Sequence, residues 1–175
     1  MPKPMIQVAG KPMLWHVMKI YSFYGFNEFI ICLGHKGEVI KDYFSNFNKN
    51  NSDFSVNLST GEYTYHNSFT EDWKVTLVDT GLETLKGGRI KRVENYTSGS
   101  TNMLTYGDGV SDININSLVK FHKSHKKLIT VTAVRPPARF GAIKIKDDKV
   151  ISFKEKSKLD EGWINGGFFV LEPKF

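Results

Sequence analysis

An aspartate between two glycines is the first residue in the sequence that we consider as a ligand-binding or catalytic group. It lies in Gly107-Asp108-Gly109, directly after a short apolar run that ends at Tyr106. A carboxylate at the carboxyl end of a buried strand occupies the position where open α/β sheets bind ligands, and glycine lets phosphate-sized groups approach the backbone. Asp-Gly is also a common turn pair, so on these residues alone a plain tight turn is an equal alternative. We take Asp108 as the centre of a candidate site.

Two cationic groups are candidates for binding phosphate. Lys3 lies between two prolines, which restrict the backbone and would present its ammonium at a defined place, although a frayed basic terminus is the simpler alternative. Gly87-Gly88-Arg89 combines close backbone approach with a forked donor that suits phosphate oxygens. A loop with a surface arginine is an equal alternative there. We expect the neighbouring Lys91 and Arg92 to be solvated.

Asn165-Gly166-Gly167 interrupts the last apolar run of the chain. A glycine pair inside a strand marks either a bulge or a place where a ligand approaches the backbone, and both alternatives stay open. The Asn165 amide offers a donor and an acceptor to sugar hydroxyls. Glu155-Lys156 follows another apolar run and is a second polar pair at the end of a strand.

Several reaction classes lose support. None of the five histidines joins a cysteine or carboxylate at metal-ligand spacing, so we assign no zinc site. The sequence contains no Walker-type phosphate loop, no G-x-S-x-G elbow and no G-x-G-x-x-G fingerprint.

The elements that would position these residues alternate between strand and helix. The continuous apolar run 28–33 predicts a parallel strand covered on both faces, and the apolar spacing over 14–24, stopped by Gly25, predicts a helix. Residues 1–5 are expected to be extended. Further strands are expected at 73–78, 104–106, 129–134, 141–145, 150–153 and 163–171, a hairpin at 54–65, and further helices at 39–47, 84–93 and 116–125, the last capped by Asn116. This pattern predicts a three-layer α/β/α sandwich with a mostly parallel, Rossmann-like sheet and antiparallel additions.

Length and composition indicate one globular domain over residues 1–175, with 40% hydrophobic residues. The 24 basic and 18 acidic residues give a net charge of +6, but the lysines are scattered, and no basic face with interleaved aromatics favours nucleic-acid binding. Cys32 is the single cysteine, which excludes an intrachain disulfide and fits the cytoplasm. Without a long apolar run or a signal peptide, we expect neither membrane insertion nor secretion.

A set of ordered motifs running from Pro2 to Leu171 resembles the sugar-1-phosphate nucleotidyltransferases. The motifs are Pro2-Lys3-Pro4-Met5, Gly10-Lys11-Pro12, Val78-Asp79-Thr80-Gly81, Gly87-Gly88-Arg89, Tyr106-Gly107-Asp108-Gly109, Phe140-Gly141, Glu155-Lys156 and Asn165-Gly166-Gly167. Leu14-Trp15-His16, Asp79-Thr80-Gly81 and Tyr106-Gly107-Asp108-Gly109-Val110 are most similar to members that transfer a cytidylyl group.

The resemblance implies transfer of a cytidylyl group from CTP to α-D-glucose 1-phosphate, giving CDP-glucose and pyrophosphate for nucleotide-sugar and cell-surface polysaccharide (O-antigen) synthesis. It implies that Asp108 binds Mg²⁺ and that Lys3 contacts the phosphates. It also implies a homo-oligomer. By the same resemblance, the nucleotide-binding residues are Thr84, Gly88, Arg89 and Gly107, and the residues that bind the sugar phosphate are Glu155, Lys156, Asn165 and Gly166. A non-catalytic nucleotide or nucleotide-sugar binding remnant that keeps Arg89 and Asp108 is the alternative.

The sequence departs from the family pattern in three ways. A G-G-x-G-T-R loop would precede Met1, a second metal-binding aspartate would follow Phe175, and Ser157 replaces a proline. We therefore expect a single domain that is incomplete at both ends. Because the central strands would lack a neighbour, we expect the 175-residue chain alone to be poorly soluble or inactive.

Overall fold

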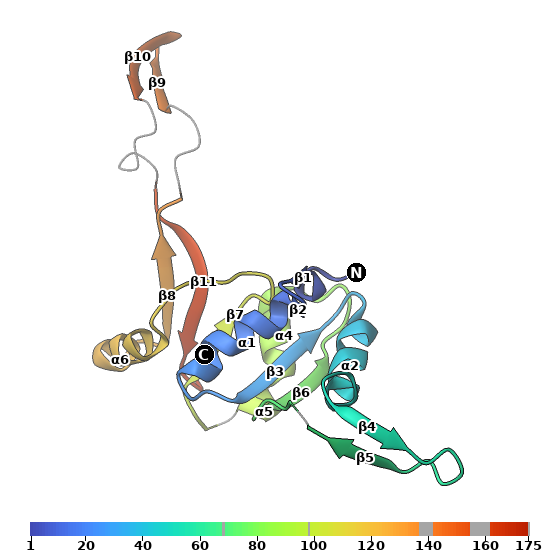
Figure 1. Cartoon of the computed structure of the whole chain (residues 1–175). Helices are drawn as coiled ribbons and strands as arrows, with labels where there is room; N and C mark the ends of the chain where they lie inside the picture. Colours follow the sequence, from blue (N-terminus) through green and yellow to red (C-terminus); the bar gives the residue numbers. More distant parts are fainter. Residues whose placement is uncertain (68, 98, 137–141, 155–161, 175) are drawn as a thin grey trace. The chain divides into compact units, whose positions relative to one another are not determined.

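The computed structural model describes residues 1–67, 69–97, 99–136, 142–154 and 162–174 (Figure 1). The chain divides into two compact units. One comprises Met1–Ser100 and Gly107–Leu118, and the other comprises Thr101–Tyr106 and Val119–Phe175.

The first unit contains most of the helices. Its elements are the 3-10 helix η1 (Lys3–Met5), β1 (Gln7–Val8), β2 (Lys11–Pro12), α1 (Met13–Phe23), β3 (Glu28–Leu33), α2 (Gly37–Ser45), α3 (Phe47–Asn50), β4 (Asp53–Val56), β5 (Tyr63–His66), β6 (Lys74–Asp79), α4 (Lys86–Arg92) and α5 (Glu94–Thr97). The second unit contains β7 (Asn102–Thr105), most of α6 (Ile115–His125), β8 (Ile129–Val134), β9 (Ala142–Lys146), β10 (Lys149–Lys154) and β11 (Ile164–Leu171).

A parallel pair of strands, β3 and β6, forms the centre of the first unit and confirms the predicted parallel strand (Figure 1). Alternate β3 side chains face Leu14 and Met18 of α1 and Ile40 of α2, and these residues belong to one apolar core. On the opposite face of β3, Cys32 lies near Arg89 of α4, and burial raises the pKa of its thiol while the Arg89 charge lowers it. Helices therefore lie on both faces of the sheet, as the sequence predicted.

Tyr43 of α2 packs against this core, and burial raises the pKa of its phenol to about 12, with a further contribution from the nearby Glu71 carboxylate. The unfolded chain would lose this proton near the ordinary value of 10.0. Between about pH 10 and 12 the folded chain therefore holds more protons than the unfolded chain, so stability falls as the pH rises through that window. Tyr43→Phe should reduce this alkaline loss, measured as the urea midpoint at pH 9, 10 and 11. The exposed Tyr96→Phe is the matched control, and equal losses in both variants would contradict the interpretation.

The second unit is built on an antiparallel sheet in the order β7-β11-β8. β9 and β10 form a separate antiparallel hairpin, and its turn places both Asp147 and Asp148 at positive φ. The β9–β10 hairpin is an antiparallel addition that the sequence predicted. The expectation of a mostly parallel sheet is wrong for the described strands, because β3 and β6 are the parallel pair among them and the other pairings are antiparallel.

Two details of the sequence-based elements are wrong. Residues Lys3–Met5 form one 3-10 turn instead of an extended segment, with the Met5 N–H donating to the Pro2 carbonyl at 2.9 Å. Helix α6 is capped by Asn114 and not by Asn116, because the Ser117 N–H donates to Asn114 Oδ1 at 2.9 Å. The buried Ile115 fixes the start of this helix one residue earlier than the polar pattern indicated.

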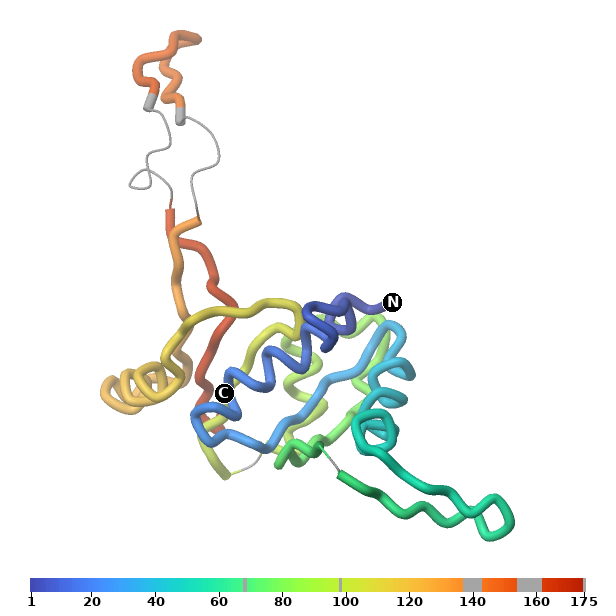
Figure 2. The backbone as a smooth tube through the Cα atoms, in the orientation of Figure 1, coloured from blue at the N-terminus to red at the C-terminus, as the bar shows by residue number. Residues whose placement is uncertain are grey.

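The predicted hairpin is present as β4 and β5, which extend away from α3 in the backbone trace (Figure 2). One of its faces carries Phe54, Val56, Tyr63 and Tyr65, and these side chains remain partly exposed. Lys49 of α3 lies 4.3 Å from the centre of the Tyr63 ring. The hairpin is an edge excursion that does not supply any of the candidate site residues.

Candidate active site

The turn that carries Asp108 lies against the turn that carries Lys3. A Cβ placed on Gly107 would be 3.2 Å from Pro4 Cγ and 3.6 Å from Leu14 Cδ1. Glycine at 107 thus leaves room for Pro4, and a larger residue would require Pro4 to move by a few tenths of an ångström. Both Lys3 and Asp108 are exposed. The fold thus brings together two segments, about a hundred residues apart in the chain, that the sequence singled out.

Arg89 lies at the carboxyl ends of the two parallel strands. Its Nη1 donates to the Leu33 carbonyl at 2.9 Å and to Thr80 Oγ1 at 2.6 Å, and Nη2 donates to the Leu82 carbonyl at 3.2 Å. A Cβ on Gly34 would be 2.6 Å from Nη2, so the glycine makes room for the guanidinium. Arg89 therefore holds a fixed positive charge where open α/β sheets bind ligands, with several of its donors already used by the protein.

Thr84 and Gly88 adjoin this arginine on the same loop and helix. A Cβ on Gly88 would be 2.9 Å from Thr84 Cγ2, so glycine is needed at that contact. Arg92 was expected to be solvated, and this is wrong in part. The side chain is exposed, but its Nη1 donates to Thr84 Oγ1 at 2.6 Å and also to the Thr80 carbonyl. The two arginines of α4 thus hold the segment that follows β6.

Thr80 is a residue that the sequence reasoning did not assign to the site. It is fully buried, and its hydroxyl donates to the Leu33 carbonyl at 2.7 Å while accepting from Arg89. The sequence feature that could have identified Thr80 is its position directly after the apolar run of β6, in Asp79-Thr80-Gly81.

The candidate sugar-phosphate residues Asn165 and Gly166 lie in β11, where the strand register shifts between Asn165 and Phe169. This irregularity agrees with the bulge, one of the two alternatives left open by the sequence, and the other alternative, approach of a ligand to the backbone, stays a prediction. A Cβ on Gly166 would be 2.9 Å from Val134 Cγ1 and 3.1 Å from the Thr132 carbonyl. Asn165 is exposed, so its amide is accessible to a ligand. The candidates Glu155 and Lys156, and also Ser157, lie outside the described residues.

Within residues 1–67, 69–97, 99–136, 142–154 and 162–174, no group of three or more histidine, cysteine, aspartate or glutamate side chains is arranged to hold a metal. Asp108 is a single exposed carboxylate in its turn. Mg²⁺ commonly binds one or two carboxylates and completes its coordination with water and substrate phosphates. The donor set at Asp108 therefore fits a magnesium ion that arrives with a nucleotide.

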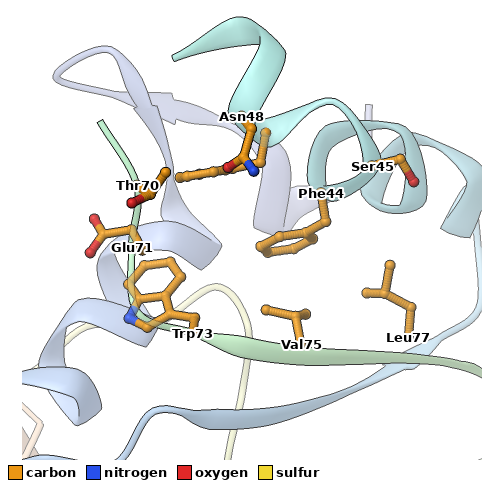
Figure 3. A pocket seen from close by; sticks show the side chains of 9 residues that line it. Phe44, Ser45, Asn48, Thr70, Glu71, Trp73, Val75 and Leu77 are labelled. Carbon is orange, nitrogen blue, oxygen red and sulfur yellow. The ribbon is translucent and has the colours of Figure 1, made fainter. Parts of the chain in front are cut away.

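A separate open cavity of about 450 Å³ lies between α2, α3 and β6 (Figure 3). The Phe44 ring extends from α2 toward Trp73 and Val75, and Leu77 also lines the cavity (Figure 3). At its rim, Glu71 accepts a hydrogen bond from Lys19 at 3.0 Å. None of the candidate site residues lines this cavity, so it is not the site described above.

The sequence matches the model of one protein family over its whole length. The model described as "Nucleotidyl transferase" matches residues 1–175. The chain belongs to the nucleotidyl transferase family. This confirms the resemblance stated from the motifs.

The chain also shows high sequence identity to individual members of the family. The chain is 50% identical over 173 residues to glucose-1-phosphate cytidylyltransferase of Salmonella typhimurium, covering 98% of this chain and 67% of that protein. It is 44% identical over 173 residues to the probable glucose-1-phosphate cytidylyltransferase of Bacillus subtilis, covering 99% and 67%. The chain therefore spans about two thirds of the length of these relatives.

Solved structures share the fold. HddC from Yersinia pseudotuberculosis matches with a TM-score of 0.65 and 24% identity, covering 99% of this chain and 68% of that one. A UDP-glucose pyrophosphorylase complexed with UDP-glucose matches with a TM-score of 0.61 and 14% identity, covering 99% and 69%. These likenesses confirm the α/β nucleotidyltransferase fold.

The candidate residues are divided between the two units. Lys3, Thr84, Gly88, Arg89, Gly107 and Asp108 belong to the first unit, and Asn165 and Gly166 belong to the second. In the described part of the chain, none of the helices is both long and apolar enough to span a membrane.

Proposed function

We propose that this protein transfers a cytidylyl group from CTP to α-D-glucose 1-phosphate, giving CDP-glucose and pyrophosphate. The observation that carries the proposal is the 50% identity, over 98% of the chain, to a relative named glucose-1-phosphate cytidylyltransferase. The exposed Asp108 carboxylate and the Arg89 guanidinium at the carboxyl ends of β3 and β6 support it, because a bound metal and a cation are the groups that compensate phosphate charge. A binding remnant without turnover is not favoured by these relatives.

In the proposed reaction a phosphate oxygen of glucose 1-phosphate attacks the α-phosphorus of CTP. The new P–O bond forms as the bond to the β-phosphate oxygen breaks, and pyrophosphate leaves with the negative charge. This step needs no protein nucleophile, so the protein contributes in-line positioning and charge neutralisation. The exposed Lys3, the half-buried Arg89 of α4 and the exposed Asp108 carboxylate are the groups proposed to meet that requirement.

We assign the roles as follows. The Asp108 carboxylate holds Mg²⁺, which when bound neutralises phosphate charge. Lys3, on the turn next to Gly107, contacts the phosphates. Arg89 contributes a positive charge held rigidly by Leu33 and Thr80 at the ends of β3 and β6. Thr84 and Gly88 line the nucleotide side, and Glu155, Lys156, Asn165 and Gly166 bind the sugar phosphate.

The test is pyrophosphate release with Mg²⁺ and glucose 1-phosphate, comparing CTP with UTP, dTTP and GTP. We would measure the 175-residue chain and the same chain joined to the segments of the Salmonella typhimurium relative that it does not cover. Release with CTP at a rate at least about ten times that with the other nucleotides supports the proposal, a ratio equal to 1.4 kcal/mol of discrimination. Preference for another nucleotide would overturn the choice of CTP. Binding of CTP without release in either protein would favour the remnant.

A further inference from the structure

Tyr106 and Asn165 are joined by a hydrogen bond between residues far apart in the chain. Asn165 Nδ2 donates to the Tyr106 hydroxyl at 2.9 Å, and Asn165 Oδ1 accepts from the Gly167 N–H at 2.8 Å. The backbone donor identifies the oxygen end of the amide, so the nitrogen end faces Tyr106. Both ends of the amide are therefore held, while a second N–H and a second lone pair remain for a ligand.

The irregular part of β11 is shaped around the Tyr106 ring. Gly167 has a φ of +84°, and a Cβ there would be 3.2 Å from Tyr106 Cδ2. The Phe169 ring meets the Tyr106 ring edge-on, with the centroids 6.0 Å apart. Any residue other than glycine at 167 would be strained and would push the ring away. The tyrosine ring and the glycine together place the phenol oxygen next to the Asn165 amide.

On its other side the same segment is held by β8. Asn165 pairs with Ala133, and Gly166 lies against Val134 and the Thr132 carbonyl. The backbone of Asn165 is therefore held by the sheet. Within the described part of the chain, its exposed side chain makes hydrogen bonds to Tyr106 and to the Gly167 N–H, and these two bonds orient the amide. Removing the phenol oxygen would leave the nitrogen end of the amide without this orienting contact.

We propose that Tyr106 is a positioning residue for the sugar half of the site: it orients the Asn165 amide so that its remaining donor and acceptor bind neighbouring hydroxyls of a hexose 1-phosphate. The inference rests on the proposed function and adds to it a residue that acts on sugar binding and not on the nucleotide. Tyr106 directly precedes Gly107-Asp108 in the chain.

The experiment is a double-mutant cycle with Tyr106→Phe and Asn165→Ala in the version of the protein that is active with CTP. Tyr106→Phe should raise KM for glucose 1-phosphate about tenfold, the worth of about one net hydrogen bond, and change KM for CTP less than about twofold. In the Asn165→Ala background, Tyr106→Phe should have no further effect, because the tyrosine acts through the asparagine. Tyr96→Phe, which removes an exposed phenol hydroxyl, is the control and should change neither constant.

The results of this experiment distinguish a wrong role for Tyr106 from a wrong proposed function. Equal increases of KM for both substrates, or effects of Tyr106→Phe and Asn165→Ala that simply add, would overturn the positioning role while leaving the transfer reaction intact. A wild-type protein that binds CTP and never transfers it would overturn the proposed function and, with it, this inference.

Discussion

Asp108→Asn should lower kcat for pyrophosphate release from CTP and glucose 1-phosphate by about 100- to 1,000-fold, a size typical of losing one preorganised electrostatic contact. The change keeps the size of the side chain and removes the charge that would hold Mg²⁺. Because Asp108 is exposed, the substitution should leave folding nearly unchanged. The loss should therefore appear in kcat and in the response to added Mg²⁺, with an unaltered circular dichroism spectrum.

Asp112→Asn is the matched control. Asp112 is an exposed aspartate four residues further along the same segment, so its substitution removes the same charge from the same neighbourhood. We expect its kcat to stay within about twofold of the wild type, since isolated surface substitutions change energies by only about 0.5 kcal/mol. If Asp108→Asn behaved like Asp112→Asn, Gly107-Asp108-Gly109 would be a plain turn and the proposed metal ligand would be wrong.

The second large effect is expected from Thr130→Val, because the Thr130 hydroxyl lies inside a buried chain of hydrogen bonds. The Lys127 N–H donates to His125 Nδ1 at 3.0 Å, so neutral His125 carries its proton on Nε2 and donates it to Thr130 Oγ1 at 2.7 Å. The Thr130 hydroxyl then donates to His122 Nδ1 at 2.7 Å. His122 Nε2–H in turn donates to Glu172 Oε1 at 2.9 Å. When both rings are neutral, this one backbone donor determines the tautomers of both histidines.

Valine at 130 would keep the branched shape and remove the hydroxyl on which both histidines depend. His122 is 1% exposed, so water cannot replace the lost donor at Nδ1. Leaving a buried polar atom without a partner costs about 1–3 kcal/mol. We expect Thr130→Val to lower the free energy of unfolding by this amount, measured from urea unfolding, and to change the ¹⁵N shifts of the His122 ring.

Thr132→Val on the same strand is the control. The Thr132 hydroxyl oxygen is buried, and the described residues include no hydrogen-bond partner for it. Replacing Thr132 by valine should leave the free energy of unfolding unchanged or raise it slightly, because the folded state no longer carries the desolvation cost of an unpaired hydroxyl. Equal destabilisation by the two variants would show that valine is simply poorly accommodated in β8, and the hydrogen-bond chain would then contribute nothing measurable.

The elements with strong local signals were predicted well from the sequence. The strand 28–33, the helix that ends before Gly25, and the strand 129–134 agree with the structure to within about a residue. Their apolar periodicity and their glycine or proline boundaries act over a few residues, so neighbouring sequence is sufficient to specify them. The predicted start of α6 was one residue too late. Asn114 and Asn116 are equally good caps by residue type, and only the burial of Ile115 selects between them.

By itself the sequence determined the α/β class, the Asp108 turn, the interruption of the last strand at Asn165-Gly166-Gly167 and, through its ordered motifs, the nucleotidyltransferase family. These features depend on residue types and on spacing along a short stretch of chain. Tertiary structure alone decided that Arg89 donates to Leu33 and Thr80, that Gly107 lies on Pro4, and that Tyr106 holds Asn165. The physical reason is that hydrogen bonds and close contacts between segments far apart in the chain depend on how strands and helices pack, and packing is a property of the whole fold that no local pattern specifies.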